Sequence, residues 1–420
     1  MHPPPASILG RGGVPRLLVS AAMRPKALLF LALFNSILGL SVLFPIMAPL
    51  GRQLGLGELE VGALSTGYSL MQFASAAFWG RKSEEKGRKP ILLVGILGFA
   101  GTFLAFALVC EAGFRGWLDH GPLFGLLLTT RVLGGLLSSA TFPTAQAYMA
   151  DITDREDRTS GMALIGAAFG LGIIFGPAIG AALSYVSLLA AVYFSVAVAV
   201  MNAIFVYTRL PEPERHQERE PGDQRAVFRR IWPLLAVGVV ATVASVAMEQ
   251  TIAFYYQDRL GLDEGETARA VGMALVLYGV VAVFVQGYLV RRVTWPPLRL
   301  MRFGLPIVLV GLVLLTFGDT FATLTGALLL QGFGQGLALP GITAFLSLSV
   351  AENEQGAVAG LNSAAQGLGR TIGPLLGTAL YEFGPTLPYW ASATLVTFVV
   401  LYLWTSPRVR RLGEAAEAQV

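Results

Sequence analysis

Three ionisable side chains lie within long apolar stretches of this sequence. They are Arg131 in TTRVLGG, Glu249 in VAMEQTI and Arg370 in GLGRTIG. If these stretches cross a bilayer, a charge near the centre costs at least about 2.5–3.5 kcal/mol, so each needs a partner or a function. Glu249 has the chemistry for reversible protonation or for pairing with a cation, and an arginine can favour the ionised form of a nearby carboxylate. The alternatives are structural: Glu249 reaches water at the membrane surface, and the arginines hold helices together.

Other reactive residue types are too sparse to build a catalytic or metal centre. The single cysteine, Cys110, excludes an internal disulfide and a cysteine-based metal site. His2, His120 and His216 lie in unrelated segments, so a histidine-ligated metal is not expected. The sequence has no Gly-x-x-x-x-Gly-Lys-Ser/Thr stretch of the kind that binds nucleotide phosphates. We therefore expect no metal, no cofactor and no enzymatic activity.

The composition predicts an all-α integral membrane protein. Of 420 residues, 54% are hydrophobic and 13% are charged, whereas soluble domains contain about 25% charged residues. A membrane-spanning helix needs about 20 mostly apolar residues, and a helix satisfies its own backbone groups in lipid. The sequence predicts twelve such helices, at 27–50, 59–79, 90–110, 123–149, 163–185, 187–207, 232–256, 268–290, 300–317, 321–349, 357–381 and 387–405.

The basic residues predict the orientation of these helices. They are spread over the loops and do not form one patch, so nucleic acid is not an expected partner despite the net charge of +4. With the N-terminus placed in the cytoplasm, 24 Lys and Arg fall in inside segments and four in outside segments. Positive residues accumulate on the cytoplasmic side. We therefore expect a multi-pass protein of the plasma (inner) membrane with both termini cytoplasmic.

One charged, proline-rich segment divides the predicted helices six and six. The sequence predicts a cytoplasmic N-terminal tail at 1–26, a six-helix bundle at 27–207, a cytoplasmic linker at 208–231, a second six-helix bundle at 232–405 and a cytoplasmic tail at 406–420. Residues 1–22 do not resemble a signal peptide. Translation starting at Met23, ahead of MRPKALLF, is as plausible as a start at Met1.

The two predicted bundles contain an internal repeat. At a fixed offset of 197 residues, FGLGIIFGPAIGAAL from Phe169 aligns with QGLGRTIGPLLGTAL from Gln366. The offset also pairs Gly135 with Gly332 and Pro143 with Pro340. Small residues let helices approach closely in lipid, so we expect tight packing, with a bend at each proline, at Gly172, Gly176, Pro177, Gly180, Gly369, Gly373, Pro374 and Gly377. Duplicated halves favour a binding site between them near mid-membrane.

Polar and aromatic residues within the predicted spans are candidates for lining that central cavity. Amides and aromatic rings suit amphiphilic or cationic compounds through hydrogen bonding, stacking and cation–π contacts. Any one of these residues can instead serve helix–helix packing. The candidates are Asn35, Phe142, Gln146, Tyr255, Tyr278, Gln335, Asn362 and Gln366.

Several motifs together resemble those of the major facilitator superfamily. GRKSEEKGRK at 80–89 resembles its signature Gly-x-x-x-Asp-Arg-x-Gly-Arg-Lys, and RVLGG at 131–135 resembles its Arg-x-x-x-Gly element. The Gly-Pro element at 176–177 is similar to that of the drug:proton antiporter branch. With ADITDREDR at 150–158 and GPLLGTALY at 373–381, the tetracycline-efflux group is the most similar in pattern.

The resemblance implies roles for two groups of residues. It implies a cytoplasmic gate at the 80–89 loop, with Arg88 and Asp151 as a pair that locks helices three and four; its residues are Gly80, Glu84, Gly87, Arg88 and Asp151. Gly87 is expected to have a positive φ at the turn. The resemblance also implies that Arg131 takes part in proton coupling. Together with the residues discussed first, this makes the proton-coupling candidates Arg131, Glu249 and Arg370.

The sequence departs from the family pattern at two places. Glu84 stands at the signature's aspartate and Glu85 replaces the following arginine, which predicts a gate that is weaker or is held by different charge pairs. In the first predicted helix, Asn35 and Ser36 stand where the tetracycline group has an acidic residue. Tetracycline itself is therefore a less favoured substrate.

These observations favour a secondary active transporter. The leading hypothesis is proton-coupled efflux of drug-like or amphiphilic small molecules by alternating access, by a monomer whose partners are its substrate, protons and the bilayer. The alternative is a metabolite or sugar transporter of the same fold, for uptake or efflux. A membrane enzyme or sensor would need a cluster of polar catalytic groups or a soluble domain, and the sequence provides neither.

Overall fold

The computed structural model describes residues 25–153, 158–213, 224–293, 295–351 and 354–417. Within those ranges all regular secondary structure is helical. The two candidate start residues, Met1 and Met23, lie outside the described residues, as do most of the predicted N-terminal tail and the middle of the predicted linker.

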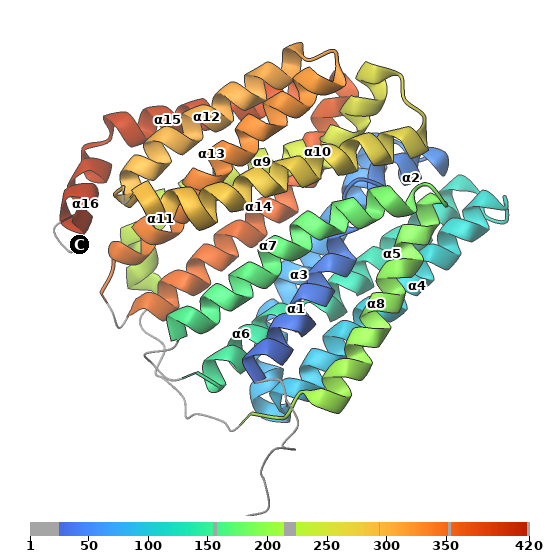
Figure 1. The fold of residues 1–420 in the computed structure, drawn as a ribbon, viewed down its shortest axis with the longest axis horizontal. Coiled ribbons are helices and arrows are strands. Elements are labelled where there is room, and N and C mark those ends of the chain that lie inside the picture. The colour runs from blue at the N-terminus through green and yellow to red at the C-terminus, as the bar shows by residue number, and fades with distance from the viewer. Residues whose placement is uncertain (1–24, 154–157, 214–223, 294, 352–353, 418–420) are drawn as a thin grey trace, which may run out of the picture.

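The first half of the chain forms eight helical segments (Figure 1). A break separates α1 from α2, and a shorter one separates α5 from α6, so that each pair forms one interrupted rod. Pro45 lies in the first break, and Pro143 lies in the first turn of α6, just after the second break; each proline lacks the amide hydrogen that would continue the preceding helix. The segments are α1 (Pro25–Ser41), α2 (Met47–Gln53), α3 (Glu58–Lys86), α4 (Arg88–Phe114), α5 (His120–Ser138), α6 (Thr141–Asp151), α7 (Arg158–Leu183) and α8 (Leu188–Arg209).

The second half of the chain is also a series of helical segments. A π-helical turn, η1 (Val285–Leu289), joins α10 to α11, whereas Pro374 lies inside an uninterrupted α14. The segments are α9 (Gln224–Leu260), α10 (Glu264–Phe284), α11 (Val290–Val293), α12 (Pro297–Phe317), α13 (Phe321–Leu348), α14 (Gln355–Phe383), α15 (Leu387–Thr405) and α16 (Pro407–Glu417).

Nine helical stretches in the described ranges are long and apolar enough to cross a membrane. They correspond to nine of the twelve predicted spans. The other three predictions fall on α1–α2, α3 and α14. The first of these is interrupted, and α3 and α14 contain many Gly, Ser, Thr and Gln because they pack against one another across the middle of the molecule. The count of twelve spans therefore stays a prediction.

The predicted linker and C-terminal tail contain more helix than expected. Helix α8 extends to Arg209 and α9 already begins at Gln224, so both ends of the 208–231 segment are helical. The 406–420 tail forms α16, which packs on α13. Its Val409 is fully buried, and the Arg408 guanidinium donates a hydrogen bond to the carbonyl of Arg230 at 2.7 Å.

The repeated glycines lie at equivalent helix contacts in the two halves. On α7, Gly172 and Gly176 face α1, and on α14, Gly369 and Gly373 face α9. A Cβ atom at Gly172 would lie 2.7 Å from Cγ2 of Ile37, and one at Gly373 would lie 2.8 Å from Cβ of Val246. Neither position has room for a side chain, as expected for helices packed on small residues.

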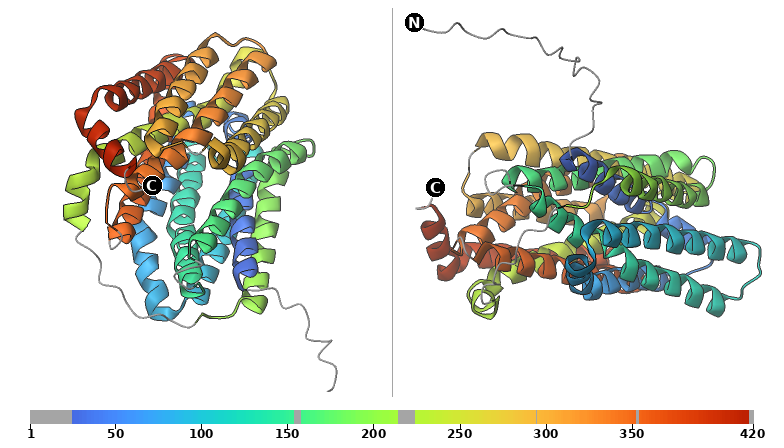
Figure 2. Two further views of the ribbon diagram at one scale, coloured as in Figure 1. Left: turned by 60° about the vertical axis from the view of Figure 1, so that its left-hand side comes forward. Right: turned by 90° about the horizontal axis from the view of Figure 1, so that it is seen from below.

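The helices of the two halves meet along two seams (Figure 2). We call residues 25–209 the N-half and residues 224–417 the C-half. Helix α3 packs on α14, and α7 packs on α10. One end of the bundle carries the α3–α4 turn, and we call it the Gly87 face. The opposite end carries α2 and the α9–α10 turn, and we call it the Arg52 face.

Candidate functional site

The signature motif forms a tight turn rather than a loop. Helix α3 continues to Lys86 and α4 begins at Arg88, so Gly87 alone connects them. Its φ of 103° is the positive value expected from the sequence. The prediction of a loop over 80–89 was therefore wrong: Gly80 and Glu84 lie in the last turns of α3, where Glu84 is exposed. A helix persists there because Arg81–Lys86 contains no proline or glycine.

Arg88 connects the start of α4 to two other helices. Its Nε donates to Oδ2 of Asp151 at 2.8 Å, and its Nη1 donates to Oγ of Ser83 at 2.7 Å. The Arg88 and Asp151 side chains are only 12% and 10% exposed. A charge pair this well shielded from water is screened less than a surface pair. It ties α4 to the end of α6 and to α3.

Glu212 is a functional candidate that the sequence analysis missed. Its carboxylate accepts hydrogen bonds from the backbone amides of Arg88 and Lys89, at 2.5 and 2.9 Å. A carboxylate at a helix N-terminus satisfies free amides and complements the helix dipole. The adjacent Pro211 carbonyl accepts a hydrogen bond from the Tyr148 hydroxyl at 2.6 Å. The beginning of the linker is thus fastened to the Gly87 turn.

Arg131 is buried inside the N-half. Its side chain is 6% exposed, and its guanidinium carbon lies 4.6 Å from the ring centre of Tyr68, 5.6 Å from that of Phe103 and 5.8 Å from that of Phe106. Within the described residues, its Nε and Nη1 have no hydrogen-bond partner. Arg131 is therefore held by aromatic faces rather than by a carboxylate.

Glu249, Tyr278 and Arg370 come from α9, α10 and α14, and α9 packs on both of the other helices. Ser245 donates a hydrogen bond to Oε1 of Glu249 at 3.2 Å, and both Arg370 and Tyr278 interact electrostatically with the Glu249 carboxylate. Arg370 is exposed, and its guanidinium carbon lies 6.0 Å from the ring centre of Phe169 on α7. The arginine therefore connects a carboxylate of the C-half with an aromatic ring of the N-half.

Phe142 extends this arrangement on the N-half. Its ring is 37% exposed and meets Phe169 edge to face, with centroids 6.1 Å apart. We call the resulting set the central cluster; its residues are Phe142, Phe169, Glu249, Tyr278 and Arg370. The cluster combines a carboxylate, a guanidinium and three rings at the junction of the halves, which is a setting for binding an amphiphilic molecule.

The remaining cavity candidates have different surroundings. Tyr255 is fully buried in the C-half and its hydroxyl donates to the Leu315 carbonyl at 3.0 Å. Gln335 is 3% exposed, and its Oε1 has no partner among the described residues. In this structure neither side chain is accessible to a substrate. The other candidates are half-buried on α1, α6 and α14, namely Asn35, Gln146, Asn362 and Gln366.

An ion-pair network joins the halves at the Arg52 face. Nη1 of Arg52 lies 2.5 Å from Oδ1 of Asp258, and Nη2 donates to Oδ2 of the same carboxylate at 3.0 Å. Nη2 also donates to Oε1 of Glu58 at 2.7 Å, and the guanidinium lies 4.9 Å from the ring centre of Phe254. Partial burial alone would lower the pKa of Arg52, but its two carboxylate partners outweigh burial and raise the pKa.

Further hydrogen bonds support this network from α14. The Tyr381 hydroxyl donates to Oδ2 of Asp258 at 2.6 Å, and the backbone amide of Leu59 donates to Oε1 of Glu382 at 3.2 Å. We call the set Arg52, Glu58, Asp258, Tyr381 and Glu382 the Arg52 latch. Sequence analysis missed it because its members lie at the ends of different spans, and the Arg52–Asp258 and Leu59–Glu382 contacts form only where the halves meet.

Comparisons with known proteins agree with this architecture. The sequence model of the Major Facilitator Superfamily matches residues 29–319 and 295–419. The chain belongs to the major facilitator superfamily. The family that the motifs predicted is therefore confirmed, and with it a helical membrane transporter.

Two relatives of this transporter are named for drug resistance. Multidrug resistance protein 1 of Bacillus subtilis (strain 168) is 26% identical over 385 residues, which are 89% of this chain and 95% of the relative. The class C tetracycline resistance protein of Escherichia coli is 28% identical over 390 residues, covering 89% and 93%. The fold is similar to that of the human organic anion transporter MFSD10, with a TM-score of 0.65, 22% identity and coverage of 91% and 99%.

Proposed function

We propose that this transporter is a secondary active exporter, which exchanges drug-like or amphiphilic small molecules for protons by alternating access. The observation that carries the proposal is the position of Glu249. Its carboxylate accepts a hydrogen bond from Ser245 and lies within electrostatic range of Arg370, and the guanidinium of Arg370 lies 6.0 Å from the ring centre of Phe169 in the other half. A carboxylate at such a junction can change its charge partner when the halves move. The resistance relatives support efflux of amphiphilic compounds.

In the proposed orientation the Gly87 face is cytoplasmic. The distribution of Lys and Arg supports it, with 24 in the segments assigned inside and four in those assigned outside. The Arg52 face is then extracellular. In this conformation the Arg52 latch holds the halves together on the outer side, so the central cluster is closed to the outside.

The proposed cycle depends on residues at three levels. The central cluster binds the substrate, with Phe142, Phe169 and Tyr278 contacting apolar or cationic groups. Protonation of Glu249 removes its negative charge and so weakens its attraction to Arg370. For the Arg52 face to open, the bonds between Arg52 and Asp258 must break. The Gly87 turn, Arg88 and Asp151 move as one unit, since each is tied to its neighbours by short hydrogen bonds.

The test compares the parent protein with Glu249→Gln in proteoliposomes under an imposed pH gradient. Ethidium and tetracycline are the transported probes, and a pH dye records proton movement. Glu249→Gln preserves the size and one hydrogen-bond acceptor but cannot bind and release a proton. We expect it to abolish gradient-driven transport while ethidium binding stays detectable. Asp319→Asn, which changes an exposed carboxylate outside the cluster, is the control and should retain transport.

Two results would contradict the proposal. Coupled transport by Glu249→Gln at the parent rate would show that the proton site lies elsewhere or that protons are not exchanged. No movement of either probe by the parent, together with uptake or efflux of a sugar or other metabolite, would favour the alternative transporter function.

A further inference from the structure

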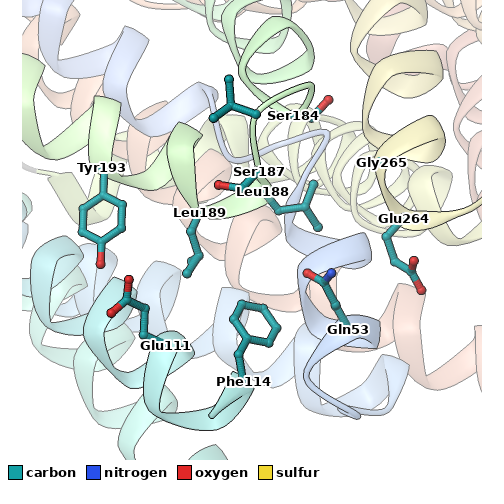
Figure 3. A pocket seen from close by; sticks show the side chains of 11 residues that line it. Gln53, Glu111, Phe114, Ser184, Ser187, Leu188, Leu189, Tyr193, Glu264 and Gly265 are labelled. Atoms are coloured by element: carbon teal, nitrogen blue, oxygen red, sulfur yellow. The ribbon is translucent and has the colours of Figure 1, made fainter.

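A cavity lies at the Arg52 face and shares no residue with the central cluster. Its volume is about 480 Å³, within the range of small-molecule sites. Its walls come from α2, α4, the α7–α8 turn, α8 and the first turn of α10 (Figure 3), and the lining includes Gln53, Glu111, Phe114, Ser187, Tyr193 and Glu264. Glu264 belongs to the C-half and the other five residues to the N-half. We call this cavity the Glu111 pocket.

The Glu111 pocket has a carboxylate on each of two walls. Glu111 projects from α4 toward the phenol of Tyr193, and Glu264 lies on the opposite side (Figure 3). An ionised carboxylate has about four acceptor positions, so Glu111 keeps capacity for a further partner. The two acidic groups give the cavity a negative potential, which raises the local concentration of cations.

Neighbouring arginines do not neutralise the pocket fully. Arg115 approaches Glu111 only to 3.5 Å, its side chain is 55% exposed, and its guanidinium lies over the ring of Trp117. An exposed pair at this distance contributes little. Arg269 lies over the ring of Tyr185, and its Nη1 is 3.1 Å from the place a Cβ atom would take at the lining residue Gly265, so this arginine borders the pocket without being one of its lining residues.

The apolar part of the lining defines the ligand further. The Phe114 ring is 42% exposed and stands between Glu111 and Gln53, and Leu188 and Leu189 complete the floor. An aromatic face next to carboxylates favours a weakly hydrated cation that carries apolar groups over a small metal ion. We propose that the Glu111 pocket binds an amphiphilic organic cation whose charge lies between Glu111 and Glu264. This site is additional to the central cluster and does not depend on proton coupling.

Such a cation could be a free compound or the amine headgroup of a lipid, since both present the same chemistry. The test uses the full chain in nanodiscs, where both faces are accessible. Val186, which lines the pocket and is 79% exposed, is changed to cysteine as a reporter. Its rate of modification by a trimethylammonium methanethiosulfonate is measured with and without tetraphenylphosphonium. The native Cys110 is fully buried, and the parent protein gives its background rate.

In phosphatidylglycerol nanodiscs, tetraphenylphosphonium should slow the modification about fivefold. Glu111→Gln and Glu264→Gln should each reduce this protection below about twofold, because each removes one charge that attracts the cation. Asp319→Asn is the control, since it removes an exposed carboxylate of the C-half that does not line the pocket. It should keep the full protection.

Absence of protection, or protection that is unchanged in both glutamine variants, would overturn the proposal. An equal loss in Asp319→Asn would also overturn it, because general surface charge would then explain the effect. Phosphatidylethanolamine nanodiscs distinguish the two sources. If the modification in these nanodiscs is already slow without tetraphenylphosphonium, and Glu264→Gln accelerates it, the occupant is the lipid amine. If the modification is as fast as in phosphatidylglycerol without tetraphenylphosphonium, the occupant is the free cation. No transport is measured, so failure of pH-driven export leaves this result unaffected.

Discussion

Arg52 and Asp258 are 206 residues apart in the chain and form a two-point contact across the junction of the halves. The two terminal nitrogens of Arg52, Nη1 and Nη2, face the two carboxylate oxygens of Asp258, at 2.5 and 3.0 Å. Such a bidentate arrangement is more directional than a lysine pair and resists sliding of one helix end past the other. In the proposed alternating-access cycle, this contact keeps the Arg52 face closed.

Asp258→Asn should open the Arg52 face more often. The side chains of Arg52 and Asp258 are 23% and 36% exposed, so solvent screening limits the network to about 1–2 kcal/mol, or roughly a five- to thirtyfold change in the ratio of closed to open molecules. Spin labels at two exposed sites of the Arg52 face, one in each half, should give longer distances. Lys82→Ala, which breaks an exposed pair with Glu85 at the other end, should not change them.

The turn between α3 and α4 gives a prediction about gating. Gly87 has a φ of 103°, and a Cβ atom there would lie 2.8 Å from Oε1 of Glu212. A β-branched residue is strained at this φ and would also displace the carboxylate that caps α4. We expect Gly87→Val to insert into the membrane but to lose transport. Gly101→Val on α4 is the matched control, because a Cβ atom at Gly101 meets nothing within 4 Å and should be tolerated. Full transport by Gly87→Val would argue against a gating role.

Some of these features could be predicted from the sequence and others could not. The positive φ of Gly87 follows from a local motif whose residues determine one turn, whereas the Arg88–Asp151 pair was expected only from the resemblance to the superfamily. The contacts of Gly172 and Gly369 were also foreseeable, because a repeated spacing of small residues implies a repeated helix contact. Glu212 could not be found in the same way, since one glutamate in a charged, proline-rich segment gives no sign of its target.

The boundaries of spans were predicted well only for uniformly apolar helices. Helix α4 is apolar along most of its length, so hydropathy identifies it directly. Helices α3 and α14 face each other, and Gly62 and Thr378 are in contact there. The facing surfaces of α3 and α14 carry small and polar residues that allow close packing. The two helices are therefore less hydrophobic on average than helices that face lipid. The contacts of the Arg52 latch that join the halves depend on the same association of α3 with α14, so the sequence alone could not reveal them.

Glu354 gives a prediction about pH. A hydrogen bond from the Ala351 amide and the Arg230 guanidinium together hold the pKa of this carboxyl below its usual range. A depressed pKa stabilises the fold above the unfolded-state value, near pH 4.3, and this contribution is lost as pH falls through the folded-state value. The protection factor of the Ala351 amide, the unprotected exchange rate divided by the observed rate at the same pH, should therefore be constant at neutral pH and fall only below about pH 4. In Glu354→Gln the protection factor should show no such transition. A transition near pH 6 would contradict this explanation.

Arg131 allows stability and transport to be separated. Its guanidinium is 6% exposed, and Nε and Nη1 have no partner within the described residues, although three aromatic rings surround it. A buried charge without a counter-charge is costly, and replacing buried charges by apolar groups of similar size often stabilises a fold by about 1–4 kcal/mol. We therefore expect Arg131→Met to raise the melting temperature of the purified protein while abolishing transport driven by a pH gradient. Arg131→Lys keeps the charge but loses the planar group that stacks on Tyr68, so it should reduce transport without the gain in stability. If Arg131→Met instead lowers the melting temperature and Arg131→Lys restores it, the charge is structural, and proton coupling must be assigned to the central cluster alone.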